Sequence, residues 1–161
     1  MPSLTLDKEL LEQLRRVLTA VEQILPKPVP TIDWAETHAA NWRRRGTGGY
    51  LDPVPEIEAF HLDDLLGIDK QKQVVEENTC QFLAGLPANN ALLWGTRGTG
   101  KSTLVRALLH SYAPQGLRVI QVDKDDLVHL PAIVDEIKRQ PYRFILFSDD
   151  VSFETGESSY K

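Results

Sequence analysis

The residues from Gly95 to Ser102 constrain the fold of this chain more than any other segment, and they read Gly-Thr-Arg-Gly-Thr-Gly-Lys-Ser. They satisfy the pattern G-x-x-x-x-G-K-[S/T], in which glycines allow backbone N–H groups to approach phosphate oxygens. An apolar run at residues 91–94 precedes the loop, and an amphipathic segment at 103–113 follows it. This order predicts a strand, a phosphate-binding loop, and a helix whose positive end faces the bound anion.

The loop pattern also predicts a role for individual residues. Lys101 is expected to reach the β- and γ-phosphates of a nucleotide, and the hydroxyl of Ser102 is expected to bind Mg²⁺. The remaining phosphate contacts are assigned to Gly95, Thr96, Arg97, Gly98, Thr99, Gly100 and Thr103. The predicted cofactors are therefore ATP and Mg²⁺.

A second acidic segment follows at residues 144–150, where an apolar strand ends in two aspartates. Charges at the carboxyl end of a strand belong at the ligand edge of an open α/β sheet. Asp149 is the candidate for holding Mg²⁺, directly or through water. Neighbouring residues on a strand face opposite ways, so Asp150 is instead the candidate for orienting or deprotonating an attacking water. Glu154 is the alternative for that role.

The C-terminal part of the chain alternates strands and helices. Strands are expected at 91–94, 118–122 and 144–147, and helices at 103–113 and 127–139. This alternation predicts an α/β fold with a parallel sheet and flanking helices. Another helix is expected from an N-cap at Asp69 to about Leu83, with Cys80 as a small buried apolar residue within it.

Two segments precede this α/β region. Residues 1–25 carry apolar side chains at steps of three and four, which predicts an amphipathic helix that packs on its own domain or binds a partner. Residues 26–60 are interpreted as a connector rich in proline and glycine. Its arginine triplet, Arg43, Arg44 and Arg45, lies among aromatics and acids, so it forms either a solvated, locally neutralised segment or a weakly supported nucleic-acid contact.

Composition excludes several classes of protein. The net charge of −5 is spread evenly along the chain, which gives no basic half for nucleic acid or anionic lipid. No apolar run approaches the roughly 20 residues that span a bilayer, and the acidic N-terminus is unlike a signal peptide. One cysteine and four scattered histidines form neither a disulfide framework nor a metal-ligand pattern. These features favour a cytoplasmic protein without a membrane partner.

The chain resembles the AAA+ class of P-loop ATPases over residues 42–161. In detail it is similar to an uncharacterised bacterial family of AAA-type ATP-binding proteins, known as a domain of unknown function. The resemblance lies in four segments: WRRRGTGGYLDPV, LDDLLGIDKQKQVV, the Walker A segment LLWGTRGTGKSTLVRALL, and the Walker B segment RFILFSDDVSFETGESSYK. It implies an AAA+-like domain over residues 61–161, with Walker A at 95–102 and Walker B at 144–150, and places Gly67 and Ile68 beside the adenine base.

The resemblance also implies features that the chain does not contain. AAA+ proteins have a sensor strand, an arginine finger and a helical lid after Walker B, and they commonly form rings. With the AAA+ strand order 5-1-4-3-2, the fourth strand would lie between the strands at 91–94 and 144–147, leaving both edges unpaired in its absence. We therefore expect the chain to be an N-terminal piece of a longer ATPase, incomplete at its C-terminus.

The leading functional hypothesis is a Mg-ATP-binding module whose full-length form hydrolyses ATP to remodel an unidentified protein partner, with nucleotide states coupled around a ring. Hydrolysis by this chain alone is not expected. An alternative is a nucleotide-dependent adaptor that switches without hydrolysis. A P-loop kinase is a further alternative, whereas a GTPase is disfavoured because no N-K-x-D motif occurs.

Overall fold

The computed structural model describes residues 8–24, 29–96 and 98–149. Its α-helices are α1 (Lys8–Ile24), α2 (Asp69–Leu83), α3 (Lys101–Tyr112) and α4 (Leu130–Ile137). Its strands are β1 (Ala39–Arg45), β2 (Gly48–Val54), β3 (Leu117–Gln121) and β4 (Arg143–Phe147). Short 3₁₀ helices are η1 (Leu62–Asp64), η2 (Ala113–Gln115) and η3 (Lys124–His129).

The four strands form one mixed sheet in the order β2-β1-β3-β4. β1 and β2 are an antiparallel hairpin, whereas β1 pairs with β3 and β3 with β4 in parallel. Because three strands run in the same direction, their carboxyl ends meet at one edge of the sheet. The predicted strands at 118–122 and 144–147 are therefore confirmed as parallel neighbours.

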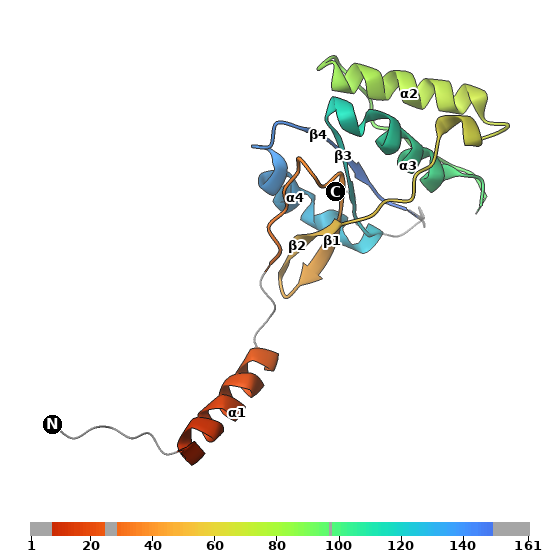
Figure 1. Cartoon of the computed structure of the whole chain (residues 1–161). Coiled ribbons are helices and arrows are strands. Elements are labelled where there is room, and N and C mark those ends of the chain that lie inside the picture. The colour runs from red at the N-terminus through yellow and green to blue at the C-terminus, as the bar shows by residue number, and fades with distance from the viewer. Residues whose placement is uncertain (1–7, 25–28, 97, 150–161) are drawn as a thin grey trace, which may run out of the picture.

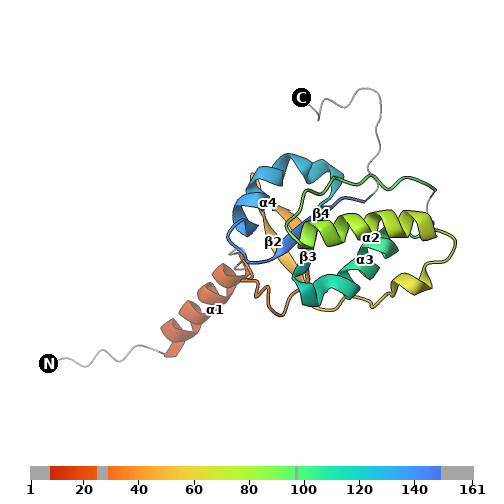
Figure 2. The same cartoon turned by 90° about the horizontal axis from the view of Figure 1, so that it is seen from above.

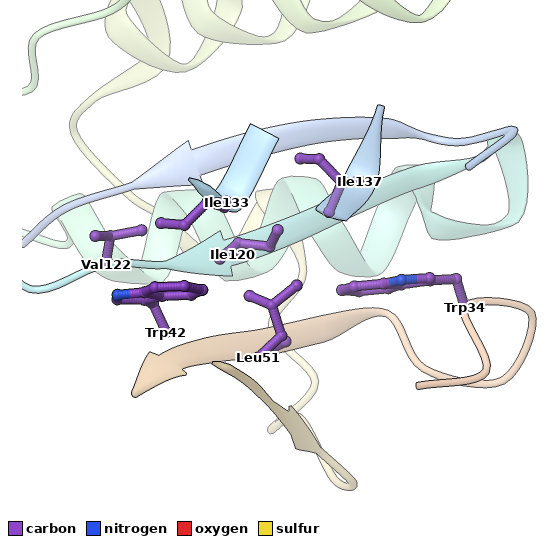
Figure 3. Close-up of a cluster of buried hydrophobic side chains, with 8 residues drawn as sticks. Trp34, Trp42, Leu51, Ile120, Val122, Ile133 and Ile137 are labelled. Carbon is purple, nitrogen blue, oxygen red and sulfur yellow. The ribbon is translucent and has the colours of Figure 1, made fainter. Parts of the chain in front are cut away.

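Helices cover both faces of the sheet (Figures 1 and 2). On one face, Ile133 and Ile137 of α4 pack against alternate strand residues such as Ile120 and Trp42. Figure 3 shows this cluster, with Trp34 and Trp42 at its two ends and Leu51 between them. On the other face, α3 packs through Val105 and Leu109 onto the intervening strand residues, including Val119 and Ile145. The structure is therefore an α/β sandwich with a mostly parallel central sheet.

The β1–β2 hairpin corrects the interpretation of residues 26–60 as a connector. Ala40 and Trp42 are buried while the residues between and after them are more exposed, so the period-two pattern of a strand is present. Glycine is required at position 49, because a Cβ there would lie 2.4 Å from the indole of Trp42. The hairpin supplies half of the sheet, and its inward side chains complete the core beneath α4.

Several local predictions also differ from the structure. Residues 91–94 form no strand, because they have no hydrogen-bonded neighbour among the described residues. The helix expected at 127–139 begins as the 3₁₀ helix η3, and Pro131 stands in the first turn of α4. Asp69 is the first residue of α2, and the N-cap is Ile68.

Cys80 is exposed, contrary to its prediction as a buried residue. Its thiol donates a hydrogen bond to the Tyr112 hydroxyl at 3.4 Å, and that hydroxyl donates to Glu76 at 2.7 Å. These contacts, with Cys80 making the larger contribution, raise the pKa of Tyr112 above its usual value. The three side chains tie α2 to α3, the helix that follows the predicted phosphate loop.

A buried arginine links the start of the sheet to its surroundings. Arg118 is only 3% exposed, and its guanidinium donates to the carbonyls of Trp34, Ala113 and Leu117 at 2.8, 3.0 and 2.8 Å. It also lies 4.1 Å from the centre of the Tyr142 ring. A buried cation is tolerated when its donors are satisfied in this way.

Helix α1 confirms the expected N-terminal helix but not its expected packing on the domain. The side chains of Leu10, Leu14 and Val17 are 49%, 47% and 59% exposed. In both views α1 lies apart from the sheet and its covering helices (Figures 1 and 2). The described side chains of α1 thus do not pack on the domain, and the alternative of a helix that binds a partner stays a prediction.

The surroundings of His38, which precedes β1, imply that the free energy of unfolding depends on pH. Burial, and then the charge of Arg118, lower its pKa from the usual 6.5, with a smaller opposing effect of Glu36. On acidification, His38 is therefore protonated in the unfolded chain at a higher pH than in the folded chain. As a result, the free energy of unfolding falls as the pH falls below 6.5 toward the pKa of His38 in the folded state. Above pH 6.5 the stabilising contribution of the neutral His38 side chain is fully present.

Urea unfolding between about pH 7.5 and pH 5.5 checks this effect. We expect the His38→Asn variant to lose less stability over that range than the parent chain. The variant of an exposed histidine, His61→Asn, is the control and should follow the parent. Equal pH slopes for the parent and His38→Asn would contradict the assignment.

Candidate phosphate and metal site

The predicted phosphate loop joins residues 91–94 to the start of α3. Gly95, Gly98 and Gly100 have positive φ angles of 145°, 84° and 83°, a region that side chains other than glycine rarely adopt. At Gly100, a Cβ would also lie 3.2 Å from Cδ2 of Leu65. Gly100 caps α3 without a side-chain hydrogen bond, so no side-chain cap satisfies the first backbone donors of the helix.

Lys101 folds back over this loop. Its ammonium donates to the carbonyl oxygens of Gly95 and Thr96 at 3.1 and 3.0 Å. The hydroxyl of Thr99 donates to the same Thr96 carbonyl at 2.9 Å. These contacts place one positive charge over an exposed loop at the positive end of a helix, which is an arrangement suited to anions.

Ser102 and Asp149 come together across 47 residues of sequence. The Ser102 hydroxyl donates to the Asp149 carboxylate with an Oγ–Oδ2 distance of 2.6 Å. Ser102 lies in the first turn of α3, and Asp149 lies two residues beyond the end of β4. A hydroxyl and a carboxylate are oxygen ligands of the kind that Mg²⁺ prefers. The two residues predicted to bind the metal are thus in direct contact.

The segment predicted to lie beside the adenine is also close to the loop. Leu65 is buried, and with Ile68 it packs against Leu104 and Leu108 of α3. Gly67 has a φ angle of 76°, and Lys72 holds the turn by donating to the carbonyls of Leu62 and Leu65. The turn that contains Gly67 and Ile68 therefore packs against α3, the helix that follows the predicted phosphate loop.

Of the other predicted site residues, one is placed by the structure and three are not described. Thr103 is half-buried in the first turn of α3. Arg97, Asp150 and Glu154 lie outside the described residues, so their roles stay predictions.

A cavity of about 380 Å³ adjoins the Ser102–Asp149 pair. It lies on the α3 side of the sheet, and none of the described loop residues (95, 96 and 98–100) lines it. The sequence analysis missed three of its polar side chains, Asn41, Gln121 and Arg106. Asn41 and Gln121 are register partners on β1 and β3. Gln121 could have been found from its position at a strand end, but Asn41 belongs to the hairpin that was interpreted as a connector.

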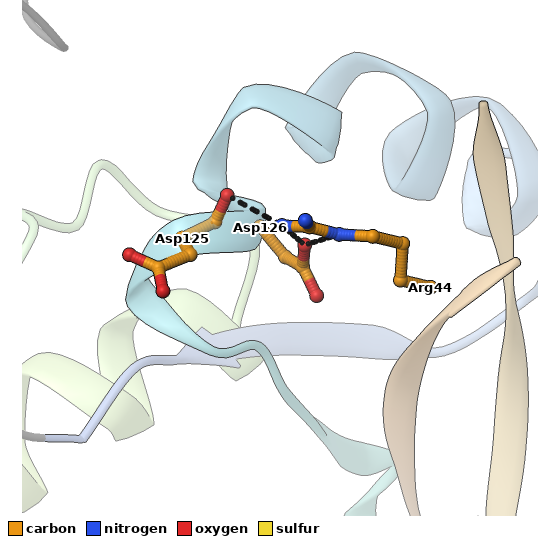
Figure 4. A network of polar contacts seen from close by, with 3 residues as sticks. All are labelled: Arg44, Asp125 and Asp126. Carbon is orange, nitrogen blue, oxygen red and sulfur yellow. Dashed lines mark hydrogen bonds and ion pairs between the residues drawn. The ribbon is translucent and has the colours of Figure 1, made fainter. Parts of the chain in front are cut away.

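The basic triplet is largely paired with acids. Arg44 donates to the Asp126 carboxylate with an Nε–Oδ1 distance of 2.7 Å and to the Asp125 carbonyl at 3.2 Å, as Figure 4 shows. The Nε atom of Arg43 lies 3.5 Å from the Oδ2 atom of Asp52. These contacts favour the locally neutralised segment over a nucleic-acid surface.

Two further kinds of site were sought in the described part of the chain. Its His, Cys, Asp and Glu side chains form no group of three that could hold a metal ion. None of its helices combines the length and the apolar character needed to cross a bilayer.

Comparison with known proteins identifies a family. Residues 35–161 match the model of a family described as a protein of unknown function (DUF815). No curated protein and no solved structure matches the chain. The matched region includes all four strands of the sheet and helices α2, α3 and α4, which together make up most of the described fold. The chain therefore belongs to the DUF815 family.

Proposed function

We propose that this chain is a Mg-ATP-binding module of the AAA+ type, and that its full-length form hydrolyses ATP. The observation that carries the proposal is the 2.6 Å contact between Ser102 and Asp149 beside a loop covered by Lys101. Two residues predicted to bind the metal and one predicted to bind phosphate, from two distant segments, lie at the start of one helix. A structural turn with no ligand would not require this combination of hydroxyl, carboxylate and ammonium.

The chemistry follows from these groups. On binding, the β- and γ-phosphates would replace the carbonyls of Gly95 and Thr96 as acceptors for the Lys101 ammonium. Mg²⁺ would be held by Ser102 and Asp149 and would neutralise charge on the phosphates. Hydrolysis would need a positioned water, for which Asp150 and Glu154 remain the candidates. Positioning and electrostatics supply most of the catalysis in phosphoryl transfer.

The proposed metal role predicts that Asp149→Asn separates metal binding from nucleotide binding. We expect the variant to bind Mg-ATP about tenfold more weakly or worse, because an amide is a poorer ligand than a carboxylate for a divalent cation. Binding of ATP without Mg²⁺ should be unchanged or tighter, since the substitution removes a negative charge near the phosphates. Isothermal titration calorimetry with and without Mg²⁺ measures both.

Asp123→Asn is the matched control, because Asp123 is an exposed acid just after β3 that does not line the cavity. It should leave both affinities at the parental values. An Asp149→Asn chain that is folded and binds Mg-ATP as tightly as the parent would remove the metal assignment.

The cavity beside Ser102 and Asp149 favours a second candidate, transfer of the phosphoryl group to an acceptor. Its volume of about 380 Å³ suits a small molecule, and Asn41 and Gln121 offer amide groups to an acceptor hydroxyl. The two candidates differ in their products. An ATPase releases phosphate in buffer alone, whereas a kinase consumes ATP only when an acceptor is added, and a non-hydrolysing adaptor does neither.

A further inference from the structure

One glycine of the predicted phosphate loop lies against a side chain from outside the loop. A Cβ at Gly100 would lie 3.2 Å from Cδ2 of Leu65. A Cβ at Gly95 would instead meet the hydroxyl of Thr99, which belongs to the loop itself. A Cβ at Gly98 would have, apart from its chain neighbours, no described atom within 4 Å. In the described part of the chain, Leu65 is therefore the side chain that limits the position of this end of the loop.

Leu65 is held on the same helix that Gly100 caps. Its side chain is buried and belongs to one cluster with Leu104 and Leu108 of α3. The Leu104 N–H donates to the Gly100 carbonyl at 2.8 Å, so Gly100 accepts the hydrogen bond that closes the first turn of α3. Leu65 thus lies against both the last glycine of the loop and the first turn of the helix.

The backbone of Leu65 is held in turn by a lysine. The ammonium of Lys72 donates to the carbonyls of Leu62 and Leu65 at 2.9 and 3.3 Å. It also lies 3.4 Å from the Asp69 carboxylate, and the Lys72 side chain is only 17% exposed. Removing an ammonium from water is costly unless its donors are paired, and three oxygen partners meet that need here. Lys72 therefore fixes the turn at residues 62–68 from α2, which lies beside α3 in both views (Figures 1 and 2).

We propose that Leu65 is a positioning residue for the phosphate loop and that Lys72 keeps Leu65 in place. The inference rests on the proposed function in one respect, because it takes the loop to be the phosphate site. Backbone N–H groups bind phosphate more tightly when they are oriented beforehand, since ordering them on binding would weaken the affinity. By limiting the movement of Gly100, Leu65 orients the N–H groups at the start of α3 before phosphate binds.

Two leucine-to-alanine variants separate positioning from stability. Leu65→Ala removes the contact with Gly100, whereas Leu108→Ala removes the same kind of side chain from the same buried cluster and leaves that contact in place. With tripolyphosphate as the probe in isothermal titration calorimetry, we expect about tenfold weaker binding for Leu65→Ala. Leu108→Ala should bind as the parent does, under conditions in which both variants are folded. Leu65→Met keeps most of the side-chain volume and should stay within about twofold of the parent.

If Leu65→Ala does not fold, the milder Leu65→Val replaces it, with Leu108→Val as its control and the same order of affinities expected. A lysine pair tests the second part of the proposal. Lys72→Gln and Lys70→Gln each remove one positive charge from α2, but Lys70 is exposed. We expect tripolyphosphate to bind more weakly to Lys72→Gln and with parental affinity to Lys70→Gln. Equal affinities of the two variants would remove Lys72 from the proposal.

Hydrogen exchange of the unliganded chain tests the positioning without a nucleotide. The Leu104 amide is bonded to the Gly100 carbonyl, so its exchange rate follows the opening of the first turn of α3. The Val122 amide is bonded to the Phe147 carbonyl of β4 and serves as the reference for the stability of the sheet. Leu65→Ala should speed exchange at Leu104 by about tenfold relative to Val122, and Leu108→Ala should not.

Two results would overturn the proposal while the proposed function stands. One is an affinity of Leu65→Ala for tripolyphosphate equal to that of Leu108→Ala, and the other is an equal relative exchange rate at Leu104 in the two variants. A parent chain that binds neither tripolyphosphate nor Mg-ATP would contradict the proposed function. The exchange rates would then still decide whether Leu65 positions the loop, so the two failures are distinguishable.

Discussion

Replacing Lys101 by alanine should abolish the stabilisation of this chain by Mg-ATP. A ligand that binds only the folded state stabilises it by about 2.7 kcal/mol at a hundredfold excess over its dissociation constant. For a chain of this size that corresponds to a rise in melting temperature of roughly 5–10 °C. Without the Lys101 ammonium, the phosphates lose the charged side chain that covers the loop, and the rise should disappear.

The same substitution should leave the unliganded chain nearly unchanged. Lys101 is half-buried, and its ammonium donates to the loop carbonyls of Gly95 and Thr96, which water can satisfy in its place. Lys70→Ala, at an exposed lysine of α2, is the control and should keep the full Mg-ATP response. Scanning fluorimetry of the three proteins measures the effect. A Lys101→Ala chain that melts as much later with Mg-ATP as the parent would contradict the phosphate assignment.

Replacing Arg118 by methionine should cost about 3 kcal/mol or more of unfolding free energy. Methionine fills much of the same volume but donates no hydrogen bond, so the carbonyls of Trp34, Ala113 and Leu117 lose their guanidinium donor. An acceptor left unsatisfied in a buried place costs about 1–3 kcal/mol. The stacking of the cation on Tyr142 is lost as well.

Urea unfolding of Arg118→Met measures this cost. Arg139→Met, at an exposed arginine, is the matched control and should stay within about 0.5 kcal/mol of the parent. Equal or greater stability of Arg118→Met would mean that the cost of desolvating the guanidinium exceeds the value of its contacts. The account of this side chain given above would then be wrong.

Sequence patterns predicted the elements that have a strong local signal. The apolar steps of α1, the helix-to-strand order of residues 101–122, and β4 with its acidic end all appear at or near the expected positions. Elements that form only by pairing with residues distant in the sequence were harder to predict. The run 39–45 contains three successive arginines, which conceal the alternation of buried Ala40 and Trp42. Only the pairing with β2 and β3 shows that it is a strand.

The reverse error occurred at residues 91–94. Their apolar composition predicts a strand, but a strand also requires a hydrogen-bonded neighbour, and the structure provides none among the described residues. Leu92 and Trp94 are consequently exposed instead of buried. Strand propensity is thus visible in the sequence, whereas strand pairing is a property of the whole sheet.

For the candidate site, the sequence predicted the residue types and the structure adds their proximity. Ser102 and Asp149 were each predicted to bind Mg²⁺, and the structure brings them into contact because a helix start and a parallel strand end lie at the same edge of the sheet. The cavity beside that pair was not predicted, because one of its walls comes from the β1–β2 hairpin. Because the hairpin was interpreted as a connector, no sequence pattern near Ser102 or Asp149 indicated that its residues would line a cavity there.

Thermal unfolding of the parent chain with and without saturating Mg-ATP tests the central claim most directly. The proposed site predicts a higher melting temperature with Mg-ATP, a smaller change with ATP in the presence of a chelator, and no change for Lys101→Ala. If the parent chain unfolds cooperatively at the same temperature without nucleotide, with Mg-ATP, and with ATP and a chelator, the assignment of residues 95–103 and Asp149 as a Mg-ATP site would be contradicted.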